Sequence, residues 1–293
     1  MVDVMKKWML QGSLATVLAS SLLLAGCGAN NQQANSTPPA QSTPATQNQA
    51  EEPAAELPKG DVELTLSAAA SLTDALQEIE QQYKATHPHV TLRFNFGASG
   101  SLQQQIEQGA PADLFLSAAS KNMEALVEKG LIDASQRTAL LNNELVVVTA
   151  KDAAFSLDGL EDLKLADIRT LAIGIPESVP AGNYAKEALT AANLWDDLTP
   201  KTVQAKDVRQ VLQYVETGNA EAGFVYKTDA LSTDQVDIAF AVDAALYPAV
   251  TYPIGIIKDT DHPDEAEALY TYLQTDEALG IFERYGFSIP ASR

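Results

Sequence analysis

The sequence predicts an α/β protein built from two lobes that face each other across a cleft. Apolar runs typical of strands alternate along residues 60–293 with segments whose apolar residues recur at helical spacing. At four places a strand segment leads through small or turn-forming residues directly into a helix. Such alternation favours parallel sheets covered by helices. In these sheets ligands bind beyond the carboxyl ends of the strands, where helix N-termini converge.

The first of the four junctions lies at residues 62–76. Residues 62–66 alternate between apolar and polar as in a strand, and three alanines then lead to Ser71. Ser71 with Asp74 predicts a capping box that starts a helix. The first N–H groups of a helix have no partner inside it, so this junction offers donors to a small oxygen-rich anion. An ordinary strand-to-helix turn is the alternative interpretation of any one junction taken alone.

Three further junctions repeat the pattern, at residues 90–106, 171–189 and 202–215. In the first of them a glycine- and serine-rich turn precedes the helix, and Ser101 with Gln104 predicts a second capping box. Asp207 is expected to cap the last of these helices, and Arg209 is interpreted as a solvated or structural charge. The recurrence makes an anion site between the four turns the favoured interpretation.

The remaining segments complete the two lobes. Further strands are expected at 113–118, 144–149, 221–226, 236–240 and 252–257, and further helices at 121–129, 134–141, 263–273 and 276–285. The strand at 144–149 is interpreted as crossing into the second lobe, and the strand at 252–257 as returning to the first. We therefore predict that residues 60–145 and 250–293 form lobe 1 and that residues 146–249 form lobe 2.

The net charge of the chain limits the kinds of partner it can have. Its 293 residues include 39 acidic and 19 basic side chains, which give a formal net charge of −20. This balance argues against a surface for nucleic acid or for anionic lipid. An anion would have to be held by local donors. An anchored hydrolase with a serine nucleophile is a third possibility, but the chain has only three histidines and no Gly-x-Ser-x-Gly motif.

Residues 1–27 have the features of a processing signal. Lys6 and Lys7 precede a short apolar stretch, which ends in Leu-Ala-Gly-Cys with Cys27, the only cysteine of the chain. This resembles a bacterial lipoprotein signal peptide, in which the cysteine becomes lipidated; a transmembrane anchor is the alternative. Residues 28–59 are rich in Asn, Gln, Ala, Ser, Thr and Pro and predict a disordered tether. The expected location is the extracytoplasmic face of the cell membrane, with the lipid on Cys27 as the anchor.

Several motifs together resemble one known family. They are Ala-Ala-Ala-Ser-Leu-Thr (68–73), Gly-Ala-Pro-Ala-Asp-Leu-Phe-Leu-Ser-Ala (109–118), Val-Pro-Ala-Gly-Asn-Tyr-Ala-Lys-Glu-Ala-Leu (179–189), Asp-Val-Arg (207–209), Gly-Phe-Val-Tyr (223–226) and Arg-Tyr-Gly-Phe (284–287). In this order they resemble the periplasmic molybdate-binding proteins of ABC importers. The resemblance implies a two-lobe periplasmic binding protein fold of class II with two crossover segments, at about 144–150 and 247–257. It implies no enzyme activity and no cofactor, and a monomer that passes molybdate or tungstate to a membrane permease.

The resemblance also implies a set of ligand-binding residues. The positions that match the family's oxyanion site are Ser71, Ser99, Ala181, Val208 and Tyr226, with Ser101 as an alternative to Ser99. They offer three hydroxyls and several main-chain N–H groups, and no acceptor. About seven hydrogen bonds to a charged group, at the low end of about 1.5–3 kcal/mol each, exceed the roughly 8 kcal/mol that micromolar binding needs. The absence of an acceptor disfavours protonated phosphate, whereas sulfate or another tetrahedral oxyanion remains an alternative ligand.

Overall fold

The computed structural model describes residues 60–291, which form two lobes, each built on a mixed sheet. The predicted signal peptide (1–27), its Cys27 and the predicted tether (28–59) lie outside these residues. The lobe 1 sheet has the order β2-β1-β3-β10-β4, with strands β1 (Val62–Ala69), β2 (Val90–Gly97), β3 (Leu114–Leu116), β4 (Ile132–Asn143) and β10 (Val250–Ile257). The lobe 2 sheet has the order β7-β6-β8-β5-β9, with strands β5 (Leu145–Ala150), β6 (Leu171–Gly174), β7 (Thr202–Ala205), β8 (Ala222–Tyr226) and β9 (Val236–Ala241). The predicted α/β class is confirmed.

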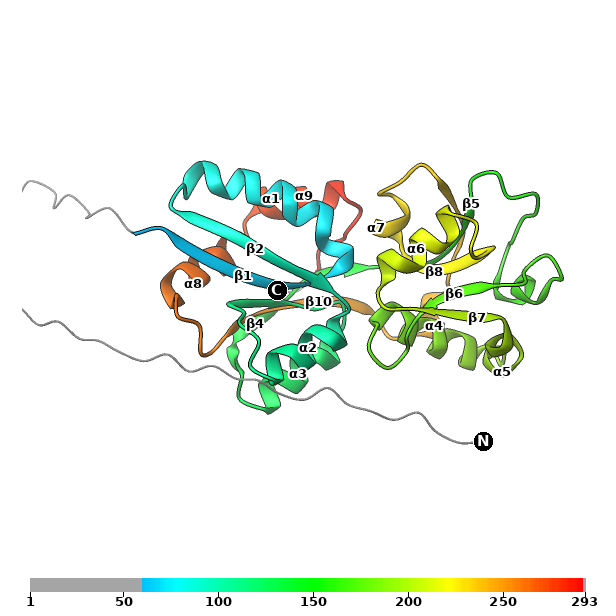
Figure 1. Ribbon diagram of the computed structural model, residues 1–293, viewed down its shortest axis with the longest axis horizontal. Helices are drawn as coiled ribbons and strands as arrows, with labels where there is room; N and C mark the ends of the chain where they lie inside the picture. The colour runs from blue at the N-terminus through cyan, green and yellow to red at the C-terminus, as the bar shows by residue number, and fades with distance from the viewer. Residues whose placement is uncertain (1–59, 292–293) are drawn as a thin grey trace, which may run out of the picture. The chain divides into compact units, whose positions relative to one another are not determined.

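The two sheets share one topology. In each, three strands run parallel, β2-β1-β3 in lobe 1 and β7-β6-β8 in lobe 2, and a fourth strand pairs antiparallel beside them. That fourth strand is β10 in lobe 1 and β5 in lobe 2, and each directly follows a passage of the chain from the other lobe. The chain therefore crosses between lobes twice, once between β4 and β5 and once between β9 and β10 (Figure 1).

Helices cover both sheets. Lobe 1 carries η1 (Ala70–Leu72), α1 (Thr73–Thr86), α2 (Ser99–Glu107), α3 (Ser120–Glu128), α8 (Pro263–Tyr272) and α9 (Asp276–Arg284). Lobe 2 carries η2 (Leu160–Lys164), α4 (Pro180–Ala191), α5 (Trp195–Leu198), η3 (Thr199–Lys201), α6 (Val208–Glu216), α7 (Lys227–Ala230) and η4 (Ala244–Leu246). In Figure 1, α1 and α9 lie on one side of the first sheet, and α2 and α3 lie on the other. Within residues 60–291 none of these helices has the length and apolar character needed to cross a membrane.

The helical faces expected from apolar spacing are the buried ones. In α6, Val208, Val211, Leu212 and Val215 are all buried. Asp207 caps this helix as predicted, because its carboxylate accepts a hydrogen bond from the N–H of Gln210 at 2.8 Å. Burial of one apolar stripe against a sheet is the main source of stability for such a short helix.

The helix expected at 134–141 is wrong, because these residues belong to β4. The strand pairs antiparallel with β10, from Asn143 opposite Val250 to Ile132 opposite Ile257. A short apolar segment can adopt either conformation, and the backbone hydrogen bonds that β10 offers decide the outcome here.

Both predicted capping boxes are also wrong. Ser71 lies inside η1, and α1 begins after Leu72, which makes no side-chain cap. α2 begins at Ser99, with Ala98 at its cap position and no capping side chain. The hydroxyls of Ser71 and Ser99 instead bond to groups far away in the sequence, which matters for the site described next.

Candidate anion-binding site

Ser71, Ser99, Ala181, Val208 and Tyr226 line one small cavity between the lobes. Ser71 and Ser99 belong to lobe 1, and the other three belong to lobe 2. The remaining lining residues are small or apolar: Ala69, Ala70, Gly97, Ala98, Ala118, Val179 and Pro180. The structure thus brings all five predicted positions together, whereas Ser101 is not part of this lining.

The cavity is small enough to limit what it can hold. Its free space is close to the minimum that holds one water molecule, so sugars, amino acids and peptides do not fit in this arrangement of the lobes. A compact ion is the class of ligand that the space suits.

Three helices begin at the cavity and supply main-chain donors. Ser99 is the first residue of α2, Val208 is the first of α6, and Ala181 is the second of α4 after Pro180. The first N–H groups of a helix have no partner within it and carry partial positive charge. Proline suits the first position of α4 because the N–H it lacks would have had no helical acceptor. These three helix starts make the cavity attractive to an anion.

Close packing places the start of α4 against β6. A Cβ atom at Gly182 would lie 2.0 Å from the carbonyl oxygen of Gly174 and collide with it. Only glycine permits this approach of helix and strand. The glycine of the Val-Pro-Ala-Gly motif therefore holds the first turn of α4 in place at the cavity.

The hydrogen-bond direction of the Ser99 hydroxyl is set by one contact within the protein. Its oxygen accepts a hydrogen bond from the N–H of Ala118 at 2.9 Å, and the serine is fully buried. A serine hydroxyl has one hydrogen of its own. Because the oxygen already accepts from the protein, that hydrogen is available to a guest in the cavity.

Tyr226 offers a second donor. It ends β8, is only 1% exposed, and its hydroxyl has no hydrogen-bond partner in the described part of the chain. Burial raises the pKa of Tyr226 well above its ordinary value, so the phenol stays protonated. A buried hydroxyl without a partner costs free energy, and an acceptor bound in the cavity would remove that cost.

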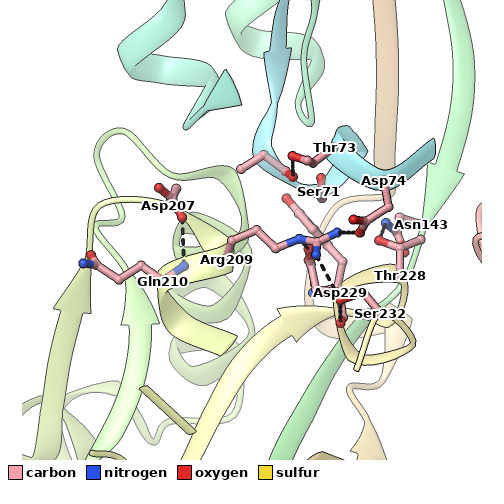
Figure 2. Close-up of polar contacts among 12 residues, drawn as sticks. Ser71, Thr73, Asp74, Asn143, Asp207, Arg209, Gln210, Thr228, Asp229 and Ser232 are labelled. Atoms are coloured by element: carbon pink, nitrogen blue, oxygen red, sulfur yellow. Dashed lines mark hydrogen bonds and ion pairs between the residues drawn. The ribbon is translucent and has the colours of Figure 1, made fainter. Parts of the chain in front are cut away.

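Among residues 60–291 no charged side chain lines the cavity, and the nearby Arg209 is committed to other partners. Its Nη2 lies 2.6 Å from Oδ2 of Asp74 in lobe 1, and its Nε lies 2.7 Å from Oδ1 of Asp229 in lobe 2. Figure 2 shows the Arg209 side chain reaching between these two carboxylates. Arg209 is thus a structural charge, as one of the two sequence interpretations held, and it links the lobes.

The positive charge of Arg209 is offset by the buried carboxylate of Asp229. Asp229 is fully buried, and burial raises the pKa of its carboxyl to about 6, although Arg209 and the N–H of Tyr226 act in the opposite direction. Near neutral pH the ionised carboxylate offsets the guanidinium. The cavity therefore attracts an anion through neutral donors and helix termini.

We expect Ser99→Ala to reduce both ligand affinity and stability. Affinity falls by about 1–3 kcal/mol, because one donor to a charged guest is lost. The free energy of unfolding without ligand falls by a similar ~1–3 kcal/mol, because the buried N–H of Ala118 loses its acceptor. Calorimetric titration and thermal unfolding measure the two effects. Ser101→Ala is the matched control, and a loss of affinity in Ser101→Ala alone would contradict the assignment to Ser99.

Comparison with known proteins places this geometry in a family. Residues 64–288 match the family model described as bacterial extracellular solute-binding protein. The chain belongs to this family. Such proteins bind solutes for transport, in agreement with the expectation of a binding protein and not an enzyme. As a substrate-binding protein of the ABC transporter kind, this family member acts outside the cytoplasm and delivers its ligand to a membrane permease.

Individual relatives are similar over most of their length. YvgL of Bacillus subtilis, named for a proposed role as an ABC transporter substrate-binding lipoprotein, is 45% identical over 271 residues, which are 92% of this chain and 95% of YvgL. The molybdate-binding protein ModA of Haemophilus influenzae is 40% identical over 228 residues, 77% of this chain and 89% of ModA.

Solved structures agree with this solute-binding protein fold. The substrate-binding domain of a proposed molybdenum ABC transporter from Clostridium difficile superposes with a TM-score of 0.62 at 43% identity, covering 78% of this chain and 99% of that one. The periplasmic molybdate-binding protein of Azotobacter vinelandii has a TM-score of 0.71 at 24% identity and supports the fold.

Two contacts at the site were missed by sequence analysis. The Ser71 hydroxyl lies 2.8 Å from the hydroxyl of Tyr252, which is 181 residues away. The N–H of Gly100 in lobe 1 donates to the carbonyl of Ser178 in lobe 2 at 3.0 Å. No local sequence pattern indicates either pairing, because both depend on how distant segments fold together.

Proposed function

We propose that this protein captures molybdate between its lobes and delivers it to an ABC importer, and that tungstate binds in the same way. The observation that carries the proposal is that the cavity, within the described part of the chain, offers hydrogen-bond donors and no carboxylate acceptor. Ser99 and Tyr226 each have a hydroxyl hydrogen free, three helices begin there, and no carboxylate lines it. A tetrahedral dianion without a proton accepts hydrogen bonds in every direction and suits such a lining.

The relatives support molybdate as the first choice. ModA proteins of Haemophilus influenzae and Escherichia coli, named as molybdate-binding, are 40% and 41% identical to this chain. Sulfate has the same charge and also lacks a proton, so it is the main competitor. Phosphate carries a proton through much of the neutral pH range. In this cavity that proton would face hydrogen-bond donors and would weaken binding.

Titration calorimetry with four anions tests the proposal. We expect molybdate and tungstate to bind with a Kd of about 1 μM or tighter, as the hydrogen-bond energies allow. Sulfate is expected to bind much more weakly, and phosphate weakest of all. Sulfate binding as tight as molybdate binding would contradict the molybdate assignment and leave an oxyanion carrier with another cargo.

The anchor and the assembly are parts of the same proposal. Cys27 carries a lipid that holds the protein at the extracytoplasmic face of the membrane, a view supported by similarity to the lipoprotein YvgL over 92% of this chain. The five ligand positions come from one chain, so a monomer suffices. Molybdenum enters only as its oxyanion, and no separate cofactor is needed. Loss of membrane association in Cys27→Ala would test the anchor.

A further inference from the structure

Ser71 differs from Ser99 because its one hydroxyl neighbour, Tyr252, does not by itself decide whether Ser71 donates or accepts. Its oxygen lies 2.8 Å from the hydroxyl oxygen of Tyr252, and either hydroxyl could donate to the other. Ser71 is 3% exposed and Tyr252 is 1% exposed, so water is not available to complete their bonding. If Ser71 donated to Tyr252, it would present a lone pair to the ligand instead of a hydrogen.

Asn143 decides which hydroxyl donates. This residue ends β4 at the first passage between the lobes, and its Oδ1 accepts a hydrogen bond from the N–H of Glu144 at 2.9 Å. That bond fixes the orientation of the amide, because a backbone N–H requires an oxygen. The Nδ2 group then donates to the hydroxyls of Tyr252 at 3.3 Å and Thr228 at 2.9 Å. Figure 2 shows Asn143 beside Thr228.

The direction of the remaining bond follows from this. Tyr252 accepts from Asn143, and its own hydrogen has the oxygen of Ser71 as an acceptor at hydrogen-bond distance. If Tyr252 instead accepted from both neighbours, its buried hydrogen would have no partner, which is costly. Burial raises the pKa of Tyr252 well above its ordinary value, so the phenol keeps this hydrogen at neutral pH.

We propose that Asn143 and Tyr252 are positioning residues that hold Ser71 as a donor and thereby weaken the binding of protonated oxyanions in the cavity. The inference rests on the function proposed above and adds the residues that set its selectivity. With Ser71 held as a donor, Ser71 and Ser99 both present hydrogens to the guest, and the unpartnered hydroxyl of Tyr226 is free to donate as well. A guest that carries a proton would turn that proton toward the hydrogens of Ser71 and Ser99 and would lose a hydrogen bond there.

Removal of the tyrosine hydroxyl tests this proposal. In Tyr252→Phe the Ser71 hydroxyl is free to rotate, so it can donate to molybdate or accept from a protonated anion. We expect molybdate affinity to fall by about three- to tenfold and the ratio of molybdate to phosphate affinity to fall at least about tenfold. Phosphate should compete with molybdate at a concentration that has no effect on the wild type, and more strongly at pH 6 than at pH 8.

Tyr247→Phe is the matched control, because it removes another hydroxyl near the passage between the lobes. The Tyr247 hydroxyl accepts from the N–H of Leu145 at 3.1 Å and does not line the cavity. We expect this variant to keep the wild-type ratio of molybdate to phosphate affinity. Thermal unfolding confirms that each variant is folded before it is titrated.

Asn143→Leu provides a second test that adds no charge. It removes the donor to Tyr252 and should shift the affinity ratio in the same direction as Tyr252→Phe. Equal losses of molybdate and phosphate affinity in both variants would overturn the inference, because they would indicate a purely structural role. Failure of the wild type to bind molybdate would contradict the proposed function. That result is distinct from failure of this inference, which only a comparison of the variants with the wild type can show.

Discussion

Replacing Gly100 by alanine is expected to weaken ligand binding at least about tenfold while leaving both lobes folded. Gly100 lies in α2 of lobe 1, and a Cβ atom there would lie only 2.7 Å from the carbonyl oxygen of Ser178 in lobe 2. The methyl group therefore opposes the approach of the lobes that closes the cavity. A ligand held by both lobes loses affinity in proportion to the population of the closed state.

The stability of Gly100→Ala without ligand should stay the same or rise. Alanine is favoured over glycine in a helix by up to about 1 kcal/mol, and in an open molecule the new methyl group meets no second lobe. Calorimetry measures the affinity, thermal unfolding measures the ligand-free stability, and small-angle scattering with and without molybdate measures lobe closure. The wild type should become more compact with ligand, and the variant should respond less.

Gly280→Ala is the matched control for this experiment. Gly280 lies within α9, and a Cβ atom there has nothing within 4 Å. The same gain in helix propensity is expected, with unchanged affinity. Wild-type affinity in Gly100→Ala would show that the contact between Gly100 and Ser178 does not belong to the ligand-bound state.

Tyr226→Phe is expected to lower affinity without lowering the stability of the ligand-free protein. One hydrogen bond to a charged guest contributes about 1.5–3 kcal/mol, so affinity should fall roughly 10- to 150-fold. The lost hydroxyl is buried without a partner when the lobes are closed and meets water when they are open, so the free energy of unfolding of the ligand-free protein should stay the same or rise by up to about 1 kcal/mol. A loss of affinity without a loss of stability is characteristic of a group kept for a ligand.

Tyr83→Phe is the control that separates an effect on stability from an effect on ligand affinity. The hydroxyl of Tyr83 is also buried without a partner, but it lies in α1 and does not line the cavity. We expect a gain in stability with unchanged affinity. A fall in ligand-free stability in Tyr226→Phe, with affinity retained, would make the tyrosine a structural residue and remove it from the site.

Local patterns were enough to locate three of the strand-to-helix junctions that meet at the site. Ser99, Ala181 and Val208 stand where a strand passes through a turn into a helix, and hydrophobic periodicity shows such junctions without a structure. The helix starts also account for the donors, because unpaired N–H groups are a property of every helix N-terminus. Ser71 and Ser99 were assigned to the site by resemblance, and the capping boxes expected at Ser71 and Ser101 were wrong.

Contacts between distant segments account for what was missed. Arg209 and Asp74 are 135 residues apart, and nothing in either neighbourhood shows that they form an ion pair between lobes. The segment from Ile132 to Asn143 was expected to contain a helix, but it is a strand because β10 supplies its hydrogen-bond partners. Short-range spacing carries no information about such partners.

The sequence by itself determined the α/β class and the order of the strand-to-helix junctions, because these depend on neighbours within a few turns of the chain, and its resemblance to a family indicated the five site positions. Only the tertiary structure decided how the hydroxyls are oriented. Ser71 meets Tyr252, Ser99 meets the N–H of Ala118, and Tyr226 meets no partner. A hydrogen bond is directional and short, so its donor and acceptor are defined only when the folded chain brings the two groups within reach.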